Sequence, residues 1–181
     1  FITSPWWGSA FSFLAILLFN INLSDTSYII ISYGLIPIAS LFWIYSFVLL
    51  VCPHLKWKIF LVYALFTACY EILFFYYLFT NPSLLAIRVS KLESETQLVV
   101  TSFALITMAI SVITNFLFMK KSLQSQERII RWKGKLIFIS LLVFILGALL
   151  DSIVSLTPLT VLITRIILMV ASILSYIGWI M

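Results

Sequence analysis

Three ionisable residues, Glu71, Asp151 and Arg165, lie within long apolar stretches of the sequence. A carboxyl group in hydrocarbon can take up and release a proton, and a guanidinium can bind an anion, so such residues mark proton relays and ligand sites in membranes. At about 1.5 Å per helical residue, all three fall in the same half of the membrane, near one end of their helices. They therefore predict an intramembrane polar cluster on the outward side.

Two interpretations of this cluster stay open. In the functional one, Glu71 is a protonatable group and Arg165 an anion anchor in a cavity that opens outward. In the structural one, Asp151 and Arg165 form a clasp between two helices, and Glu71 is hydrogen-bonded to a neighbour. The Asp151–Arg165 pair favours the structural interpretation, whereas Glu71 has no evident partner in the sequence. The residues expected to line the cavity in the functional case are Ser32, Tyr33, Thr101 and Thr107.

Other catalytic chemistry lacks the residues that it needs. His54 is the only histidine, too few for a His-rich metal site or a bis-histidine haem. Cys52 and Cys69 stand too far apart along a helix for a disulfide bond, and two cysteines build no Cys-based metal site. There is no Gly-rich phosphate loop either. We expect no metal, no cofactor, no nucleic acid and no enzymatic activity.

The composition indicates which elements must position the polar residues. Of the 181 residues, 64% are hydrophobic and only 9% are charged, and the mean hydropathy is +1.20. A soluble domain carries roughly a quarter charged residues. So much exposed hydrocarbon is stable only in a bilayer, where helices satisfy their own backbone hydrogen bonds. The sequence predicts an all-α, polytopic transmembrane helix bundle.

Six apolar stretches, separated by charged residues, prolines or polar clusters, form a single transmembrane domain over residues 1–181. The expected spans are 6–21, 28–51, 59–79, 98–119, 136–156 and 159–180. The first is short for a hydrocarbon core of about 30 Å. Pro37 should kink the second, because it leaves the carbonyl of Tyr33 without its helical donor. The chain begins at Phe1 rather than at methionine, so one further upstream helix would make these six of seven.

Basic residues between spans predict the orientation. The link between the fourth and fifth spans contains Lys120, Lys121, Arg128, Arg131, Lys133 and Lys135. Lys56 and Lys58 lie on the same side, whereas the opposite links are close to neutral. By the positive-inside rule both ends of the chain are cytoplasmic, in a multi-pass protein of the cell membrane. The basic link is expected to contact anionic lipid headgroups, or partners such as another membrane protein or a second copy of this chain.

The longer link on the outward side, residues 81–97, contains the apolar run from Leu84 to Ile87. This run is expected either to lie along the membrane interface as a short helix or to cover the bundle from outside. Within the fourth span, Ala104, Thr107, Ser111 and Asn115 follow helical spacing. Such a stripe of small and polar residues is typical of a close contact between membrane helices.

The C-terminal part of the sequence resembles a known family. The residues that carry the likeness are RWKGK at 131–135, GALLDS at 147–152, TPLT at 157–160, ITRI at 163–166 and YIGW at 176–179. Over about residues 128–181 they resemble multi-spanning membrane proteins of unknown activity from Asgard (Lokiarchaeal-type) archaea. The resemblance implies an archaeal cell membrane and a bundle of six or seven helices. It implies no activity.

The predicted function is a non-enzymatic, receptor-like or scaffold helix bundle with its polar cluster on the outward side. One alternative is a small secondary transporter, with Glu71 as the proton-titrating group and Arg165 as the anion anchor. No inverted repeat or pair of broken helices supports that alternative. A further alternative is an accessory subunit of a larger membrane complex, which would need no chemistry of its own.

Overall fold

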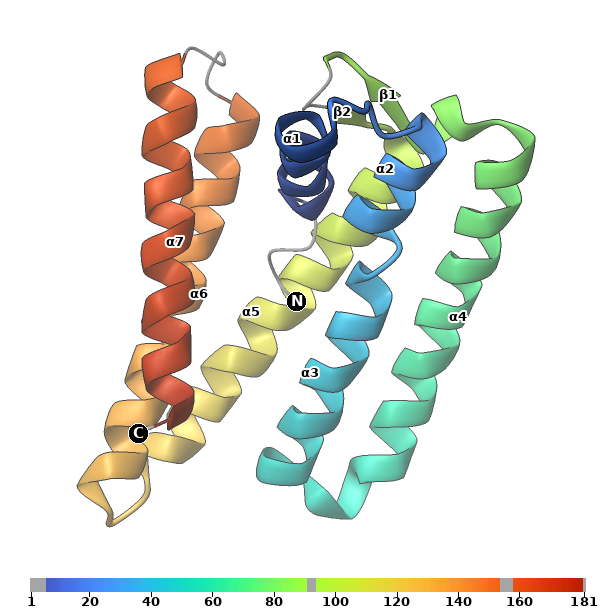
Figure 1. Ribbon diagram of the computed structural model, residues 1–181. Helices are drawn as coiled ribbons and strands as arrows, with labels where there is room; N and C mark the ends of the chain where they lie inside the picture. The colour runs from blue at the N-terminus through green and yellow to red at the C-terminus, as the bar shows by residue number, and fades with distance from the viewer. Residues whose placement is uncertain (1–5, 91–93, 154–157, 181) are drawn as a thin grey trace. The chain divides into compact units, whose positions relative to one another are not determined.

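The computed structural model describes residues 6–90, 94–153 and 158–180, and the side chains at 151–153, 158, 159 and 161 lie outside this description. The chain forms two compact units, Phe1–Ile110 and Ser111–Met181. The boundary between the units falls within a long helix (Figure 1). Each unit is considered by itself below.

Helices make up most of both units (Figure 1). They are α1 (Trp7–Phe19), α2 (Asp25–Tyr33), α3 (Ile36–Val51), α4 (Lys56–Thr80), α5 (Leu98–Leu123), α6 (Arg128–Ile153) and α7 (Pro158–Ile180). Within the described residues, five helical stretches are long and apolar enough to cross a membrane, with α2 and α3 counted together. The predicted all-α helix bundle is confirmed.

Helix α1 is shorter than the first predicted span. It has 13 residues, which at about 1.5 Å per residue reach only about 20 Å of a hydrocarbon core of about 30 Å. The helix ends because Asn20 adopts the left-handed conformation, with a φ of 53°, and its amide donates to the carbonyl of Ile16 at 3.0 Å. By its length, α1 is a short apolar helix rather than a full span.

The second predicted span is broken near Pro37, as the sequence indicated. Helix α2 ends at Tyr33, and α3 begins at Ile36 with Pro37 in its first turn. Proline has no amide hydrogen, so the regular helical ladder cannot continue through it. The hydrogen bonds resume when the amide of Ala39 donates to the carbonyl of Leu35 at 3.0 Å. The kink thus divides this span into two helices.

The core of the first unit lies between α2, α4, the beginning of α5 and the link that joins α4 to α5. Its buried members are Ile29, Tyr33, Tyr70, Phe74, Leu78, Leu85, Ala86, Val100 and Phe103. The ring of Tyr70 stacks on that of Phe103, with centroids 3.7 Å apart and an interplanar angle of 14°. Phe66 stacks on the same phenylalanine at 5.3 Å. Aromatic packing therefore joins α4 to α5 in this unit.

The link between α4 and α5 forms a β-hairpin, which the sequence did not indicate. After the 3₁₀ turn η3 (Pro82–Leu84), strand β1 (Ala86–Arg88) pairs antiparallel with β2 (Ser94–Thr96). Leu85 is 0% exposed and Ala86 4%, so this apolar run covers the end of the core. The alternative of a short interfacial helix is wrong, because Ala86 to Arg88 are extended and pair with β2.

The second unit contains α6 and α7 packed side by side, together with the end of α5 (Figure 1). Glycines allow α6 and α7 to approach closely. A Cβ on Gly178 would lie 2.9 Å from Cγ1 of Ile137, and one on Gly147 would lie 3.0 Å from Cγ2 of Ile167. Small residues at such positions are how membrane helices bring their backbones together.

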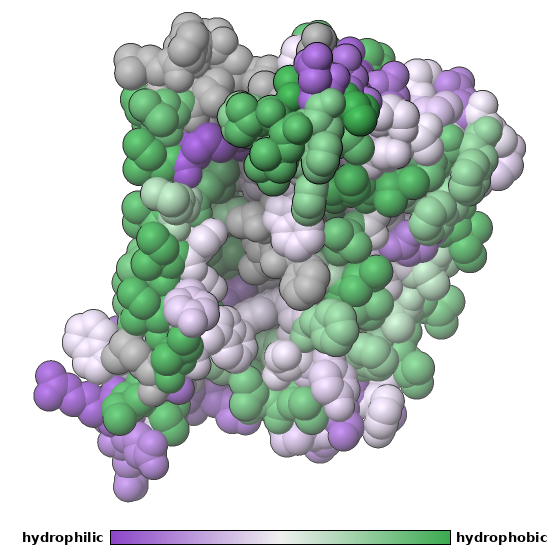
Figure 2. Space-filling view, in the orientation of Figure 1, coloured by the Kyte–Doolittle hydropathy of each residue, from purple (hydrophilic) through white to green (hydrophobic). Residues whose placement is uncertain are grey.

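The outer surface of the helices is apolar. Figure 2 shows hydrophobic side chains along α4 and α7, and hydrophilic ones around the turn between α5 and α6. Large apolar side chains are far more exposed than in a soluble domain, with Phe79 at 78% and Val62 at 72% on α4. Because an exposed apolar surface of this extent needs hydrocarbon around it, the helices are suited to a lipid environment.

Candidate functional site

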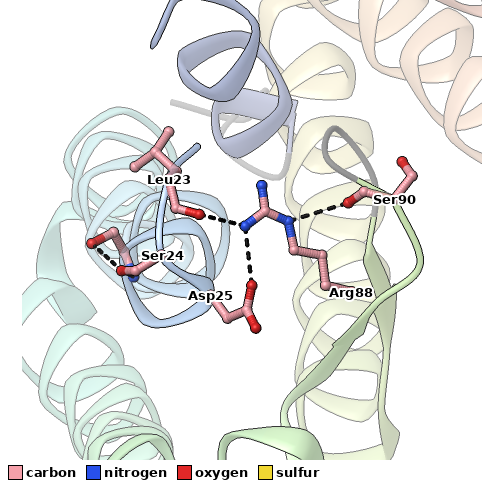
Figure 3. Close-up of polar contacts among 6 residues, drawn as sticks. Leu23, Ser24, Asp25, Arg88 and Ser90 are labelled. Atoms are coloured by element: carbon pink, nitrogen blue, oxygen red, sulfur yellow. Dashed lines mark hydrogen bonds and ion pairs between the residues drawn. The ribbon is translucent and has the colours of Figure 1, made fainter. Parts of the chain in front are cut away.

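Arg88 lies at the centre of the polar contacts of the first unit. Strand β1 directs its side chain toward the beginning of α2 (Figure 3). The Nη1 group donates to the carbonyl of Leu23 at 2.6 Å and to Oδ1 of Asp25 at 3.0 Å. The Nε group donates to the carbonyl of Ser90 at 3.2 Å. One guanidinium therefore connects the hairpin to the segment that begins α2.

The two ends of the Asp25–Arg88 ion pair have different environments. The side chain of Arg88 is 16% exposed and that of Asp25 is 72% exposed. The guanidinium carbon lies 5.0 Å from the centroid of the Tyr28 ring, and that tyrosine is buried. The Tyr28 hydroxyl shares a hydrogen bond of 3.1 Å with Ser9 of α1. The cation is thus held in a partly apolar, hydrogen-bonded site, and the carboxylate is open to solvent.

A cavity of about 260 Å³ lies beside this ion pair. It is bounded by α2, by the turn η3 and by both strands of the hairpin. Its lining residues are Asp25, Tyr28, Ile29, Pro82, Ser83, Ala86, Ile87, Arg88 and Ser94. Since a water molecule takes about 30 Å³, the volume suits several waters or one small organic molecule. The cavity offers opposite charges, hydroxyl groups and an apolar wall.

Two of the predicted cavity residues instead hold the hairpin. The hydroxyl of Tyr33 shares a hydrogen bond of 2.8 Å with Oγ of Ser94, which joins α2 to β2. Thr101 donates from its hydroxyl to Thr96 at 2.9 Å, which joins α5 to β2. Both strands are therefore fastened to the helices of the first unit by side chains, Arg88 on β1 and these two pairs on β2.

The other two predicted cavity residues have buried hydroxyl groups. The oxygens of Ser32 and Thr107 have no hydrogen-bond partner among the described residues. Ser32 packs directly against α1, because a Cβ on Gly8 would lie 1.9 Å from its Oγ. Within the described part of the chain, the lining of the Asp25–Arg88 cavity includes none of the four predicted residues. A second cavity lined by them around Glu71 stays a prediction.

Glu71 lies on α4, and its Oε2 atom is buried without a hydrogen-bond partner in the described residues. The hydroxyl of the adjacent Tyr70 is buried in the same way. The Oε2 atom of Glu71 therefore does not support the interpretation in which Glu71 is hydrogen-bonded to a neighbour. An intramembrane carboxyl with a buried, unpartnered oxygen is a functional candidate, because an ionised group in hydrocarbon is costly.

Arg165 and Asp151 belong to the second unit, on α7 and α6. Arg165 is half-buried, and its neighbour Thr164 is buried at 4% exposure. The side chain of Asp151 lies outside the described residues, so the clasp between these two helices stays a prediction. Glu71 belongs to the first unit, and the joint cluster of the three residues therefore stays a prediction as well.

The basic link is shorter than expected, because both helices continue past the predicted span ends. Helix α5 runs to Leu123 and α6 begins at Arg128, which leaves a turn of residues 124–127. Arg131 closes this turn by donating to the carbonyls of Ser125 at 3.0 Å and Gln126 at 3.2 Å. This contact is structural and was not expected. Of the other basic residues, Lys120, Lys121, Arg128 and Lys135 are exposed and Lys133 is half-buried.

The sequence missed the Asp25–Arg88 site because both residues stand in links between apolar stretches. A usable signal was present in the order of the links. Asp25 and Arg88 stand in links separated by two apolar spans, so both links lie on the same side of a membrane and the two charges can meet. In the described ranges, no group of three or more His, Cys, Asp or Glu residues is placed to hold a metal ion.

Comparison with protein-family models, curated proteins and solved structures finds no match for this chain. Its five long apolar helical stretches, within the described residues, fit a multi-pass helical membrane protein. Its role is inferred from its own residues.

Proposed function

We propose that this chain is a non-enzymatic, receptor-like module of a cell membrane, and that the Asp25–Arg88 cavity binds a small polar ligand. The observation that supports this most directly is the cavity of about 260 Å³ with a charged pair in its wall. Ligand sites are concave, largely apolar and supplied with a few polar groups that set orientation. The exposed carboxylate of Asp25 suits an amine, and Ser83 and Ser94 offer hydroxyl groups to other polar atoms.

The position of the cavity suits a receptor-like role. A ligand in it touches α2 as well as the hairpin, and α2 is separated from α3 by the break before Pro37. A ligand shifts a conformational equilibrium only through contacts that differ between the two states. A bound ligand that changes the contact between α2 and the hairpin would provide such a difference. The break before Pro37 would then let α2 move relative to α3.

The orientation is part of the proposal. The Asp25–Arg88 contact at 3.0 Å brings two links of the first unit together, as expected if both lie on one side of the membrane. The positive-inside rule then puts the cavity outside and both ends of the chain in the cytoplasm. If the resemblance to the Asgard family holds, the membrane is archaeal.

The test is ligand-dependent stabilisation of the purified protein. A panel of small amines, amino acids and organic acids is screened by thermal unfolding, against the chain and the variant Ile87→Trp. Ile87 lines the cavity and is 49% exposed, so tryptophan fills the space while Arg88 and Asp25 remain. A ligand at 100 times its Kd stabilises a protein by about 2.7 kcal/mol, which is readily seen.

The matched control is Val89→Trp, at an exposed position that does not line the cavity. We expect a hit to stabilise the original chain and the Val89 variant but not the Ile87 variant. Equal stabilisation of all three proteins would place the ligand elsewhere. No hit from any class in the panel would count against the ligand-binding role.

A second candidate function is proton-coupled transport through Glu71, and the unpartnered Oε2 atom of this residue favours it. Proteoliposomes with a pH-sensitive dye inside would report proton entry driven by a solute gradient. Transport that stops in Glu71→Gln but persists in Ile87→Trp would support this function. Absence of proton movement with any solute tested would leave Glu71 a structural residue.

A further inference from the structure

Four exposed basic residues lie on the two helices near the turn where α5 meets α6. Lys120 and Lys121 lie in the last turn of α5, Arg128 begins α6, and Lys135 follows two turns later. All four are exposed, and they belong to one compact unit. We call them the basic surface. Glu127 is the only acidic residue in the segment from 120 to 135, so the local charge is strongly positive.

The geometry separates this surface from its basic neighbours. Arg131 is occupied by the carbonyls of Ser125 and Gln126, so its guanidinium serves the turn. Lys120, Lys121, Arg128 and Lys135 are set apart by their exposure, a distinction that the sequence did not make. Arg128 and Arg131 are three residues apart on α6 and are expected to differ in role. Arg131 holds the turn, whereas Arg128 is exposed.

Apolar side chains accompany the exposed cations. Ile129 is 56% exposed and Trp132 46%, on the first two turns of α6. The Nζ atom of Lys135 lies 5.3 Å from the centroid of the Trp132 ring. Exposed tryptophan and isoleucine beside lysine and arginine are typical of a membrane interface, where apolar groups enter the acyl region and cations stay among the headgroups. A soluble acidic partner would leave these apolar groups in water.

We propose that the basic surface binds the headgroups of anionic phospholipids in the leaflet that surrounds this end of α5 and α6. The charges are complementary, and each basic residue near an anionic leaflet adds attraction. Arg128 also stands at the N-terminus of α6, where the helix dipole is positive and the first turn contains no acidic residue. A phosphate headgroup there offsets the repulsion between this cation and the helix end.

The experiment is a titration of phosphatidylglycerol in phosphatidylcholine vesicles containing the full chain. Brominated phosphatidylglycerol quenches the fluorescence of Trp132, which is isolated by subtracting the signal of a Trp132→Phe variant. Each charge lost from the basic surface should weaken binding about five-fold, the equivalent of about 1 kcal/mol per basic residue. The triple variant Lys120→Gln, Arg128→Gln, Lys135→Gln should therefore need about a hundred-fold more anionic lipid for half-maximal quenching.

The matched control is Arg131→Gln, which removes one charge from the same helix. The amount of anionic lipid that it needs for half-maximal quenching should stay within two-fold of the value for the original chain. Its thermal unfolding midpoint should fall, because the turn loses its two hydrogen bonds from Arg131. A charge-keeping variant, Arg128→Lys, should retain the affinity and show that charge rather than folding is measured. Equal quenching of the original chain and the triple variant would overturn the proposal. Binding of polyglutamate, a soluble acidic polymer, is measured on the same proteins. If the triple variant loses polyglutamate binding but binds lipid as the original chain does, the surface serves an acidic protein and the proposal is overturned.

Discussion

At the residue scale, Arg88 contributes more than an ion pair. Exposed ion pairs stabilise proteins by only about 0.2–1 kcal/mol, and the carboxylate of Asp25 is 72% exposed. Hydrogen bonds from a charged donor contribute about 1.5–3 kcal/mol, and Arg88 makes two to backbone carbonyls, a part-buried one to Leu23 and an exposed one to Ser90. The two members of the pair should therefore respond very differently to substitution.

We predict that Asp25→Asn lowers the free energy of unfolding by about 0.5 kcal/mol. Arg88→Met should lower it by about 2 kcal/mol, because the carbonyls of Leu23 and Ser90 lose their donor. Reversible unfolding in mixed micelles, followed by circular dichroism, measures both. Equal losses in the two variants would contradict the role of the carbonyl contacts.

A double-mutant cycle tests the predicted clasp between α6 and α7. Arg165→Ala should destabilise the protein more when Asp151 is present than in an Asp151→Asn background, because the first case leaves an ionised carboxylate without its partner. A coupling free energy above about 0.5 kcal/mol would indicate a direct pair. Additive losses would show that the two residues do not interact.

At the element scale, the contact between α5 and α6 depends on a missing side chain. A Cβ on Gly134 would lie 2.5 Å from Cβ of Ser122, closer than two such atoms can approach. The hydroxyl of Ser122 donates to the carbonyl of Ile130, so the serine cannot simply move away. The short turn of residues 124–127 and this close approach together set the geometry of the pair.

We predict that Gly134→Ala lowers the free energy of unfolding by about 1–3 kcal/mol, the usual cost of overpacking. In a Ser122→Gly background, which removes the obstructing atoms, the same substitution should be neutral or stabilising, because alanine favours a helix over glycine. Thermal unfolding of the four proteins gives the comparison. If Gly134→Ala is equally harmful in both backgrounds, the contact with Ser122 does not limit the approach of these helices.

At the scale of the whole molecule, the apolar exterior and the charged ends indicate how the chain crosses a membrane. Helices with exposed phenylalanine, leucine and valine are long and apolar enough to cross the hydrocarbon, and hydrophilic side chains gather around the turn between α5 and α6 (Figure 2). The side on which each end lies is testable without knowledge of a ligand.

We predict that Lys56→Cys and Lys121→Cys, each in a Cys52→Ser, Cys69→Ala background, react with a membrane-impermeant maleimide only from the cytoplasmic side. Val89→Cys in the hairpin should react only from outside. Lys56 begins α4, Lys121 lies in the last turn of α5, and Val89 follows strand β1. All three positions are exposed or half-buried, so access should not limit labelling. Labelling of Val89→Cys and Lys56→Cys from the same side would overturn the orientation.

How far the sequence predicted the site differs from residue to residue. Arg131 was expected to face lipid or a partner, but in the structure it closes a turn, since charge counts cannot tell which cation reaches a backbone carbonyl. Tyr33 and Thr101 were expected to line a cavity, and the hydrogen bonds of both lead to β2. The role of Glu71 stays a prediction, and its buried, unpartnered Oε2 atom makes it the residue to test first for proton binding.

The sequence by itself determined the fold class and the break at Pro37. It also determined five of the six predicted spans, the exception being the first, which is the short helix α1. These features follow from local rules, namely hydropathy over about 20 residues and the missing amide of proline. Only the tertiary structure decided the hairpin, the Asp25–Arg88 contact and the cavity beside it. Arg88 meets Asp25 from 63 positions away, and such a pairing depends on how helices pack, which no local pattern records.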